Sequence, residues 1–243
     1  MDSGFYAACA GLRAQSQALD LIAANVANVS TGGYRAQQPT FRTVLAGATQ
    51  LAAYPLNRAI NNFGVLAGTR LDLSSASMEP TGSELDLAVE GDGFFAVQTA
   101  AGVRYTRNGN FRLSPKRELM TAAGDAVMGE QGPLRLPAGP VSISTDGSIS
   151  VNGALAGKLR VVEFAPETQL APEGESYYRA DGAGLTATHS RLRQGMLESS
   201  NVNPLQAAAN LITAQRQAEM MQRTLSIFHS EFNRISATEL SRV

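Results

Sequence analysis

The stretch "ANVANVSTGGYR", residues 24–35, follows a run of regularly spaced apolar residues. It concentrates two asparagines, a Ser-Thr pair and a Gly-Gly pair, a composition compatible with a ligand loop, a phosphate loop or a helix end. A phosphate loop places its glycines before a helix, whereas these glycines come after one. We therefore interpret the stretch as the end of a helix, where glycine turns the chain outward.

The residues before this stretch predict a long N-terminal helix. Apolar side chains recur every seven residues, with a second set three residues later: Phe5, Leu12, Leu19 and Val26, then Ala8, Ile22 and Val29. This is the a/d pattern of a coiled coil, and it covers residues 3 to about 29.

The C-terminal segment has a similar pattern. Apolar residues follow alternating spacings of three and four: Leu211, Ala214, Ala218, Met221, Leu225, Phe228, Phe232 and Ile235. Pro204 directly after Asn203 is typical of a helix start. Neither glycine nor proline occurs from 205 to 243. A helix of roughly 35 residues would be about 50 Å long, which favours a coiled coil.

The centre of the chain predicts strands. Alternating runs from about 84 to 190 are separated by turn signals at Asn108-Gly109, Asp146-Gly147 and Asn152-Gly153. Asn-Gly and Asp-Gly between such runs predict hairpins. Residues 36–78 are polar, have no strong periodicity and predict an extended linker.

Together these patterns predict an α+β fold, with long N- and C-terminal helices forming a coiled-coil domain around a central all-β domain made of hairpins. We expect the N-terminal helix in 1–35, the linker in 36–78, the β domain in 79–192, and a return segment with the C-terminal helix in 193–243. Each helix needs another helix, in its own chain or in a neighbouring subunit, to bury its apolar stripe.

The amino-acid composition argues against several classes of function. A 44 % hydrophobic content supports a folded protein, and a net charge of −1 argues against a nucleic-acid partner. One cysteine excludes an internal disulfide and a cysteine-rich metal site. No apolar run is long enough for a transmembrane helix, and no basic region precedes Arg13, so we expect no cleaved signal peptide.

The sequence offers no convincing set of catalytic residues. His189 and His229 have no companions at metal-ligand spacing. Alternation places Glu84, Asp86 and Glu90 on one face of a strand, which we interpret as a solvated face. We therefore expect no enzyme activity, no cofactor, no metal and no small-molecule substrate.

Three stretches together resemble one family. "ANVANVSTGGYR" (24–35) is similar to the N-terminal signature of bacterial flagellar rod and hook proteins. "LDLAVEGDGFFAVQTAAGVRYTRNGNFRLS" (85–114) resembles their central segment, and "GMLESSNVNPLQAAANLITAQRQAEM" (195–220) their C-terminal segment. The three lie in the family's order and span nearly the whole chain.

The resemblance implies a structural subunit of the flagellar basal-body rod, required for motility and assembling through its terminal helices into a periplasm-spanning shaft. The implied partners are other rod subunits, hook-side or ring proteins, and the flagellar type III export apparatus, which needs no cleaved signal. The chain length and the stretches "MDSGFYAA" and "VMGEQGPLRLPAG" are most similar to the proximal rod branch. The distal rod branch or another hook-family axial subunit is the alternative.

Two alternatives come from other classes of protein, a peptidoglycan-active hydrolase and a secreted β-rich binding protein. The hypothesis of assembly into a rod predicts an interface between subunits. Asn25 and Asn28, three residues apart, are expected to share one helix face within it. The predicted interface residues are Leu12, Leu19, Asn25, Asn28, Leu211, Met221, Leu225, Phe228 and Phe232.

Overall fold

The structure is a computed structural model that describes residues 2–43, 64–165, 167–174, 176–182 and 184–240 of the chain. Side-chain environments are described within this part for 11–40, 69–165, 167–174, 176–182, 184–224, 226–227 and 230. Contacts divide the chain into two compact units. Unit 1 contains 1–27, 37–70 and 203–243, and unit 2 contains 28–36 and 71–202.

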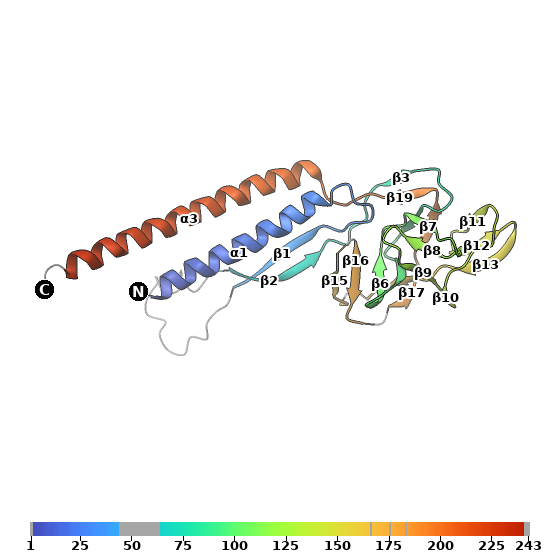
Figure 1. The fold of residues 1–243 in the computed structure, drawn as a ribbon, viewed down its shortest axis with the longest axis horizontal. Coiled ribbons are helices and arrows are strands. Elements are labelled where there is room, and N and C mark those ends of the chain that lie inside the picture. Colours follow the sequence, from blue (N-terminus) through green and yellow to red (C-terminus); the bar gives the residue numbers. More distant parts are fainter. Residues whose placement is uncertain (1, 44–63, 166, 175, 183, 241–243) are drawn as a thin grey trace. The chain divides into compact units, whose positions relative to one another are not determined.

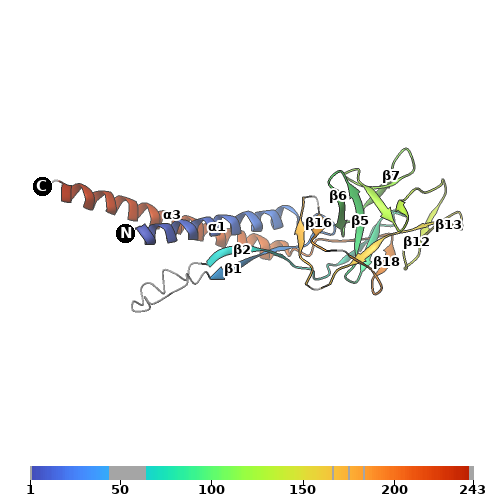
Figure 2. The same cartoon turned by 90° about the horizontal axis from the view of Figure 1, so that it is seen from below.

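Unit 1 consists of two helices and a two-stranded ribbon. Helix α1 spans Asp2–Ala27 and helix α3 spans Pro204–Leu240, 26 and 37 residues respectively. They run side by side in opposite directions, and α3 continues past the start of α1 (Figure 1). Strands β1 (Gln37–Thr43) and β2 (Gly64–Leu71) pair with each other, and β1 contacts α1 (Figure 2).

Alanine side chains form the buried part of the helix pair. Among the described helical residues, those less than one tenth exposed are Ala14, Ala18, Ala207 and Ala214. Gln15 of α1 donates from Nε2 to the Ala214 carbonyl oxygen of α3 at 3.3 Å and to Gln217 Oε1 at 3.1 Å. Small side chains let two helix backbones approach closely, so this contact depends on alanine rather than on leucine.

The predicted fold class is wrong in its coiled-coil domain. Within the described residues there are two helices and a large β-rich remainder, and the helices share unit 1 with the ribbon β1–β2. A coiled coil inserts its large a and d side chains into holes of the partner helix. Here Leu12 and Leu19 are only half-buried, and the buried positions belong to four alanines, of which the apolar pattern had selected only Ala214. The β-rich centre agrees with the prediction in part.

Unit 2 contains the remaining strands. Their bounds are β3 Met78–Pro80, β4 Leu87–Glu90, β5 Phe94–Thr99, β6 Gly102–Thr106, β7 Phe111–Leu113, β8 Leu119–Thr121, β9 Ala126–Gly129, β10 Gly132–Pro133, β11 Val141–Ile143, β12 Ser148–Val151, β13 Ala154–Lys158, β14 Val161–Glu163, β15 Leu170–Pro172, β16 Tyr177–Ala180, β17 Leu185–Thr186, β18 Arg191–Gln194 and β19 Met196–Glu198.

These strands form one large sheet and three small ones. The large sheet has the order β15-β16-β6-β5-β9-β8-β7, with β10 on β9, β14 on β5 and β17 on β14. The small sheets are β11-β12-β13, β18-β4 and β19-β3. The last two are long-range pairs that place residues 191–198 beside 78–90. One apolar core, which includes Leu87, Phe95, Val127 and Ile149, holds the sheets together.

Two of the three predicted hairpins are confirmed. Strand β11 pairs with β12 across Asp146-Gly147, and β12 pairs with β13 across Asn152-Gly153. Asn152 and Gly153 have φ values of 53° and 79°, the left-handed pair that a tight two-residue hairpin requires.

The third hairpin, at Asn108-Gly109, is not formed. Strand β6 pairs with β5 and β16, whereas β7 pairs with β8. Gly109 instead lies against Leu87, whose N–H donates to the Gly109 carbonyl oxygen at 3.1 Å. A Cβ on residue 109 would be 1.7 Å from the Leu87 carbonyl oxygen. The glycine therefore permits a close backbone approach and does not make a hairpin turn.

Gly109→Ala is expected to lower the free energy of unfolding of the full-length chain by about 3 kcal/mol or more, because the added methyl overlaps a backbone oxygen. Urea unfolding of the mutant and the wild type measures the loss. Gly182→Ala is the matched control, since its Cβ would be 3.8 Å from the nearest atom, and it should change stability by less than about 1 kcal/mol. Equal effects of the two substitutions would contradict the role given to Gly109.

Candidate functional site

Two arginines and a glutamate that are distant in sequence meet inside unit 2. Arg35 Nη2 lies 2.7 Å from Glu198 Oε1, and Arg107 Nη1 lies 3.4 Å from Glu198 Oε2. All three side chains are at most 1 % exposed. We call Arg35, Arg107 and Glu198 the arginine-glutamate cluster. Its single carboxylate uses both oxygens, one for each guanidinium group.

Arg107 is held by further groups of unit 2. Its Nη2 donates to the Gly91 carbonyl oxygen at 2.6 Å and its Nη1 to the Val89 carbonyl oxygen at 3.3 Å. Its Cζ lies 4.7 Å from the centre of the Phe94 ring, a cation-π distance. Burial, followed by the charge of Arg35, lowers the pKa of Arg107 to about 10, against the opposing effect of Glu198. Arg107 is therefore still charged at neutral pH.

The other two members of the cluster also form further hydrogen bonds within unit 2. The Arg35 N–H donates to the Tyr178 hydroxyl at 3.0 Å, and burial raises the pKa of that phenol to about 12. Glu198 Oε1 accepts a second hydrogen bond, from the Ala76 N–H at 3.0 Å. Buried charges are tolerated when hydrogen bonds replace the lost water, and these bonds do so for the carboxylate.

Glycine is required beside the cluster. The Gly33 N–H donates to the Glu198 carbonyl oxygen at 2.8 Å, and its φ is 68°. A Cβ on residue 33 would lie 2.3 Å from the carbonyl carbon of Arg107. The second glycine of "STGGYR" therefore permits this contact between the backbone segments that contain Arg35 and Arg107.

Asn201 connects the chain segments around the cluster. Its Nδ2 donates to the carbonyl oxygens of Asp72 at 2.8 Å and Ser74 at 3.1 Å. Its Oδ1 accepts from the Ala36 N–H at 2.7 Å. One amide side chain thus joins the segments 33–36, 72–77 and 198–201. The cluster and Asn201 together unite residues from all three stretches quoted above.

Known proteins match the chain in these same stretches. A family model described as "Flagella basal body rod protein" matches residues 5–35, one described as "Flagellar hook protein FlgE/F/G D1 domain" matches 88–151, and one described as "Flagellar basal body rod FlgEFG protein C-terminal" matches 193–235. Each matched range contains one member of the arginine-glutamate cluster.

Similar proteins extend over nearly the full chain. The flagellar basal-body rod protein FlgF of Caulobacter vibrioides is 31 % identical over 97 % of this chain and 98 % of its own length. The chain belongs to the flagellar basal-body rod protein family. FlgF of Salmonella typhimurium is 34 % identical, over 93 % of this chain and 94 % of its own. FlgG of Bacillus subtilis is 32 % identical, over 87 % and 89 %.

The family membership confirms the function inferred from the three motifs. The chain is a structural subunit of the rod in the basal body of the bacterial flagellum, and its function belongs to motility. The resemblance to the rod family stated in the sequence analysis is confirmed as well, by matches to proteins named FlgF and then to proteins named FlgG.

The predicted interface residues lie mostly on the two helices of unit 1. Leu12 and Leu19 on α1 and Leu211 and Met221 on α3 are half-buried. Leu225, Phe228 and Phe232 belong to α3, but their side chains lie outside the described residues.

The two asparagines do not share a helix face as predicted, because α1 ends at Ala27. Asn25 binds the start of β1: its Nδ2 donates to the Gln37 carbonyl oxygen at 2.8 Å, and its Oδ1 accepts from the Gln37 N–H at 2.9 Å. Asn28 lies in the following turn, where its Oδ1 accepts from Thr31 Oγ1 at 3.1 Å. Each asparagine therefore satisfies groups of its own chain.

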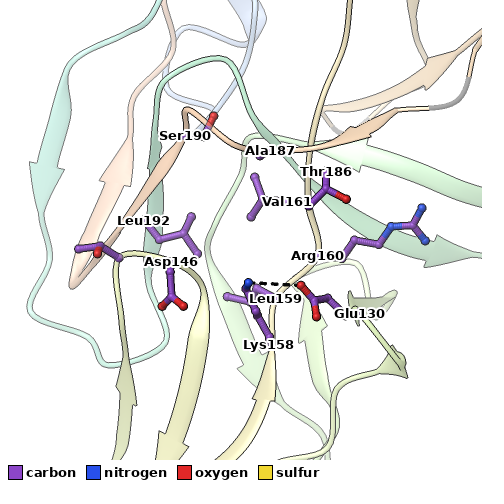
Figure 3. Close-up of a pocket in the computed structure, with 11 residues that line it drawn as sticks. Glu130, Asp146, Lys158, Leu159, Arg160, Val161, Thr186, Ala187, Ser190 and Leu192 are labelled. Carbon is purple, nitrogen blue, oxygen red and sulfur yellow. Dashed lines mark ion pairs between the residues drawn. The ribbon is translucent and has the colours of Figure 1, made fainter.

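A polar pocket of about 330 Å³ lies elsewhere in unit 2 (Figure 3). Its charged lining includes Lys158 and Glu130, which form an ion pair at 3.4 Å. Ser190 at its edge donates to Glu163 Oε1 at 2.8 Å and accepts from the Gly93 N–H at 2.8 Å. The Ser190 hydroxyl is thus engaged in two hydrogen bonds within unit 2.

Glu163 organises the turn before β18. Burial acts to raise its pKa, but hydrogen bonds from Ser190 and the His189 N–H outweigh burial and lower it. Its carboxylate therefore stays ionised at neutral pH and acts as an acceptor. In the part of the chain that the structure describes, no three His, Cys, Asp or Glu residues are grouped as a metal would need, and no helix is long and apolar enough to cross a membrane.

Sequence reasoning missed the arginine-glutamate cluster. Arg35, Arg107 and Glu198 each stand at the end of an apolar or glycine-rich run, which resembles a solvated boundary. It also placed Asp86 on a solvated face, but Asp86 is 6 % exposed and accepts from Thr81 Oγ1 at 2.7 Å. Each of the three motifs contains one member of the cluster, but two of the motifs contain further charged residues, so the sequence alone does not single the members out.

Glu198→Gln is expected to lower the free energy of unfolding by about 3–5 kcal/mol, because two buried arginines would lose their only carboxylate in the cluster. Urea unfolding of the full-length chain measures this loss. The control is Glu90→Gln, which breaks the Arg193–Glu90 pair at 2.9 Å, where both side chains are about half exposed. That substitution should cost less than about 1 kcal/mol. Comparable losses of unfolding free energy in the two variants would contradict the importance given to burial of the arginine-glutamate cluster.

Proposed function

We propose that this chain is the proximal rod subunit and that it co-assembles there with other rod proteins. The support is the near full-length similarity to proteins named FlgF in several bacteria. The similarity to FlgG proteins is of the same order, so the distal rod position is the alternative. The observation that carries the proposal is that all three family motifs join in one buried cluster.

The proposal includes the partners of the chain. Unit 1 contacts neighbouring rod subunits, through residues that include Leu12, Leu19, Leu211 and Met221. Hook-side or ring proteins are further partners. Neither a nucleic acid nor a small molecule is expected among them. The near-neutral charge of −1 is in keeping with partners that are proteins.

We also propose that the subunit has a structural role and no catalytic activity. The motivating observation is the serine of the polar pocket, whose hydroxyl is taken up by Glu163 and a backbone N–H. A cell-wall hydrolysis assay with the purified chain should give no product, and release of muropeptides above the buffer control would contradict this part of the proposal.

Deleting the gene should stop rod assembly before the distal subunits are added, because a proximal subunit is the base on which later ones bind. Mass spectrometry of purified basal bodies is expected to find the inner ring proteins but at least tenfold less distal rod and hook protein, and complementation restores both. Basal bodies that retain all other rod proteins and lack only the hook would place the chain at the distal end instead.

The chain is also proposed to reach the periplasm-spanning rod through the flagellar export apparatus without cleavage of a signal. Intact-mass measurement on the subunit from basal bodies should give the mass of the full chain, with or without Met1. The support is membership in the flagellar basal-body rod protein family. A mass that corresponds to loss of fifteen or more N-terminal residues would refute this route.

A further inference from the structure

A second, smaller pocket of unit 2 lies beside the Asn108-Gly109 pair. Its volume is about 250 Å³, and its described lining consists of asparagines, threonines, alanines and one tyrosine, all of them uncharged. Every lining residue belongs to unit 2. We call this pocket the amide pocket, because Asn28, Asn108 and Asn110 contribute three side-chain amides to it.

The two asparagines on either side of Gly109 are held in fixed orientations. Asn108 Oδ1 accepts from the Asn110 N–H at 3.1 Å, and Asn110 Nδ2 donates to Oδ1 of the buried Asp86 at 3.2 Å. The backbone between them is fixed by the close contact of Gly109 with Leu87. An amide has one donor group and one acceptor group, so these bonds decide which group of each side chain is still available.

One donor and one acceptor of the amide pocket are available to a ligand. Among the described residues, Asn108 Nδ2 and Asn110 Oδ1 have no hydrogen-bond partner. In contrast, Thr121 Oγ1 and the Tyr177 hydroxyl lie 2.8 Å apart and bind each other, and the Tyr177 hydroxyl also donates to Asp125 at 2.9 Å. A ligand would therefore meet an NH2 group and a carbonyl group that are already in place, which lowers the entropy cost of binding.

The lining selects for a neutral ligand that is rich in hydroxyl groups. An ionic group would lose its hydration here without meeting an opposite charge, which is costly. A peptide would need pockets for its side chains, but the lining offers only Ala122, Ala123 and the ring of Tyr177 as apolar surface. A hydroxyl group both donates and accepts, so two neighbouring hydroxyls of a sugar ring are complementary to Asn108 Nδ2 and Asn110 Oδ1.

We propose that the amide pocket binds one neutral sugar unit of a polysaccharide chain. The volume lies below the lower limit of about 300 Å³ for pockets that hold drug-sized ligands, and this favours a single sugar ring. Ala122 and Ala123 are small and exposed, so the polysaccharide has space to continue beyond the bound unit. The half-buried ring of Tyr177 provides an apolar surface for the C–H groups of the sugar.

The first test measures binding of neutral sugars to the purified full-length chain by saturation-transfer NMR. The probes are maltotetraose, cellotetraose and chitotetraose (the N-acetylated tetramer), with glucose and N-acetyl-trialanine amide for comparison. We expect transfer to the protons of at least one tetrasaccharide and weaker transfer to glucose and to the peptide. Absence of transfer to all three tetrasaccharides would overturn the proposal. Stronger transfer to the peptide would overturn the assignment to a sugar, and equal affinity for glucose the assignment to a polysaccharide.

The second test locates the binding site. Asn108→Asp keeps the oxygen that accepts from the Asn110 N–H but replaces the NH2 donor by a charged oxygen. The dissociation constant of the bound tetrasaccharide should rise about tenfold or more. The control is Asn203→Asp at the start of α3, where Oδ1 likewise accepts a backbone N–H, from Gln206 at 3.1 Å, and this variant should bind as the wild type does.

A third variant makes the test independent of the Asn108 hydrogen bond. Ala123→Gln narrows the amide pocket from an exposed position and should weaken binding to a similar extent, while urea unfolding shows that all three variants are folded. An unchanged dissociation constant in Asn108→Asp or in Ala123→Gln would overturn the site. Because binding is measured on the purified chain outside the rod, such a result would leave the proposed function intact.

Discussion

The carboxylate of Glu198 is the constraint on which the arrangement of unit 2 depends. It binds Arg35 and Arg107 in the interior, and its backbone carbonyl accepts the N–H of Gly33. A buried ion pair adds little net stability, because desolvation offsets the attraction. Its effect is selective: any arrangement that separates the three residues leaves a charge buried without a partner. The two ion pairs join residues that are 163 and 91 positions apart in the chain. An arrangement that separated them would be strongly unfavourable.

Two members of the cluster also lie close in sequence to the terminal helices. Arg35 follows the last residue of α1, Ala27, by eight positions, and Glu198 precedes the first residue of α3, Pro204, by six. The cluster therefore fixes, within unit 2, the spacing between the two segments that continue into the helices. Asn201 adds the segment at 72–77, which continues from β2.

The sequence predicts what depends on local pattern and misses what depends on long-range contact. Both terminal helices follow from apolar periodicity and the Asn203-Pro204 start, and the hairpin at Asn152-Gly153 follows from residues that accept positive φ. The hairpin at Asn108-Gly109 is wrong because Gly109 serves an approach to Leu87, which is distant in sequence. The coiled-coil domain is wrong because period alone does not say which stripe is buried. Alanine is only weakly hydrophobic and stands out little in an apolar pattern. Yet the buried contact between α1 and α3 is formed by Ala14, Ala18, Ala207 and Ala214.

The arginine-glutamate cluster was also missed because it depends on contacts between residues distant in the sequence. Arg35, Arg107 and Glu198 have no periodicity, and a single charge after an apolar run is usually solvated. Only the fold reveals that each is a buried residue of its motif. The motifs could be recognised as a family signature from the sequence, but the reason for their joint occurrence is geometric. Gly33 must be glycine for the backbone to reach Arg107, and Arg35 can then reach Glu198. Because the three motifs share these buried contacts, the effects of substitutions in two of them are expected to be non-additive.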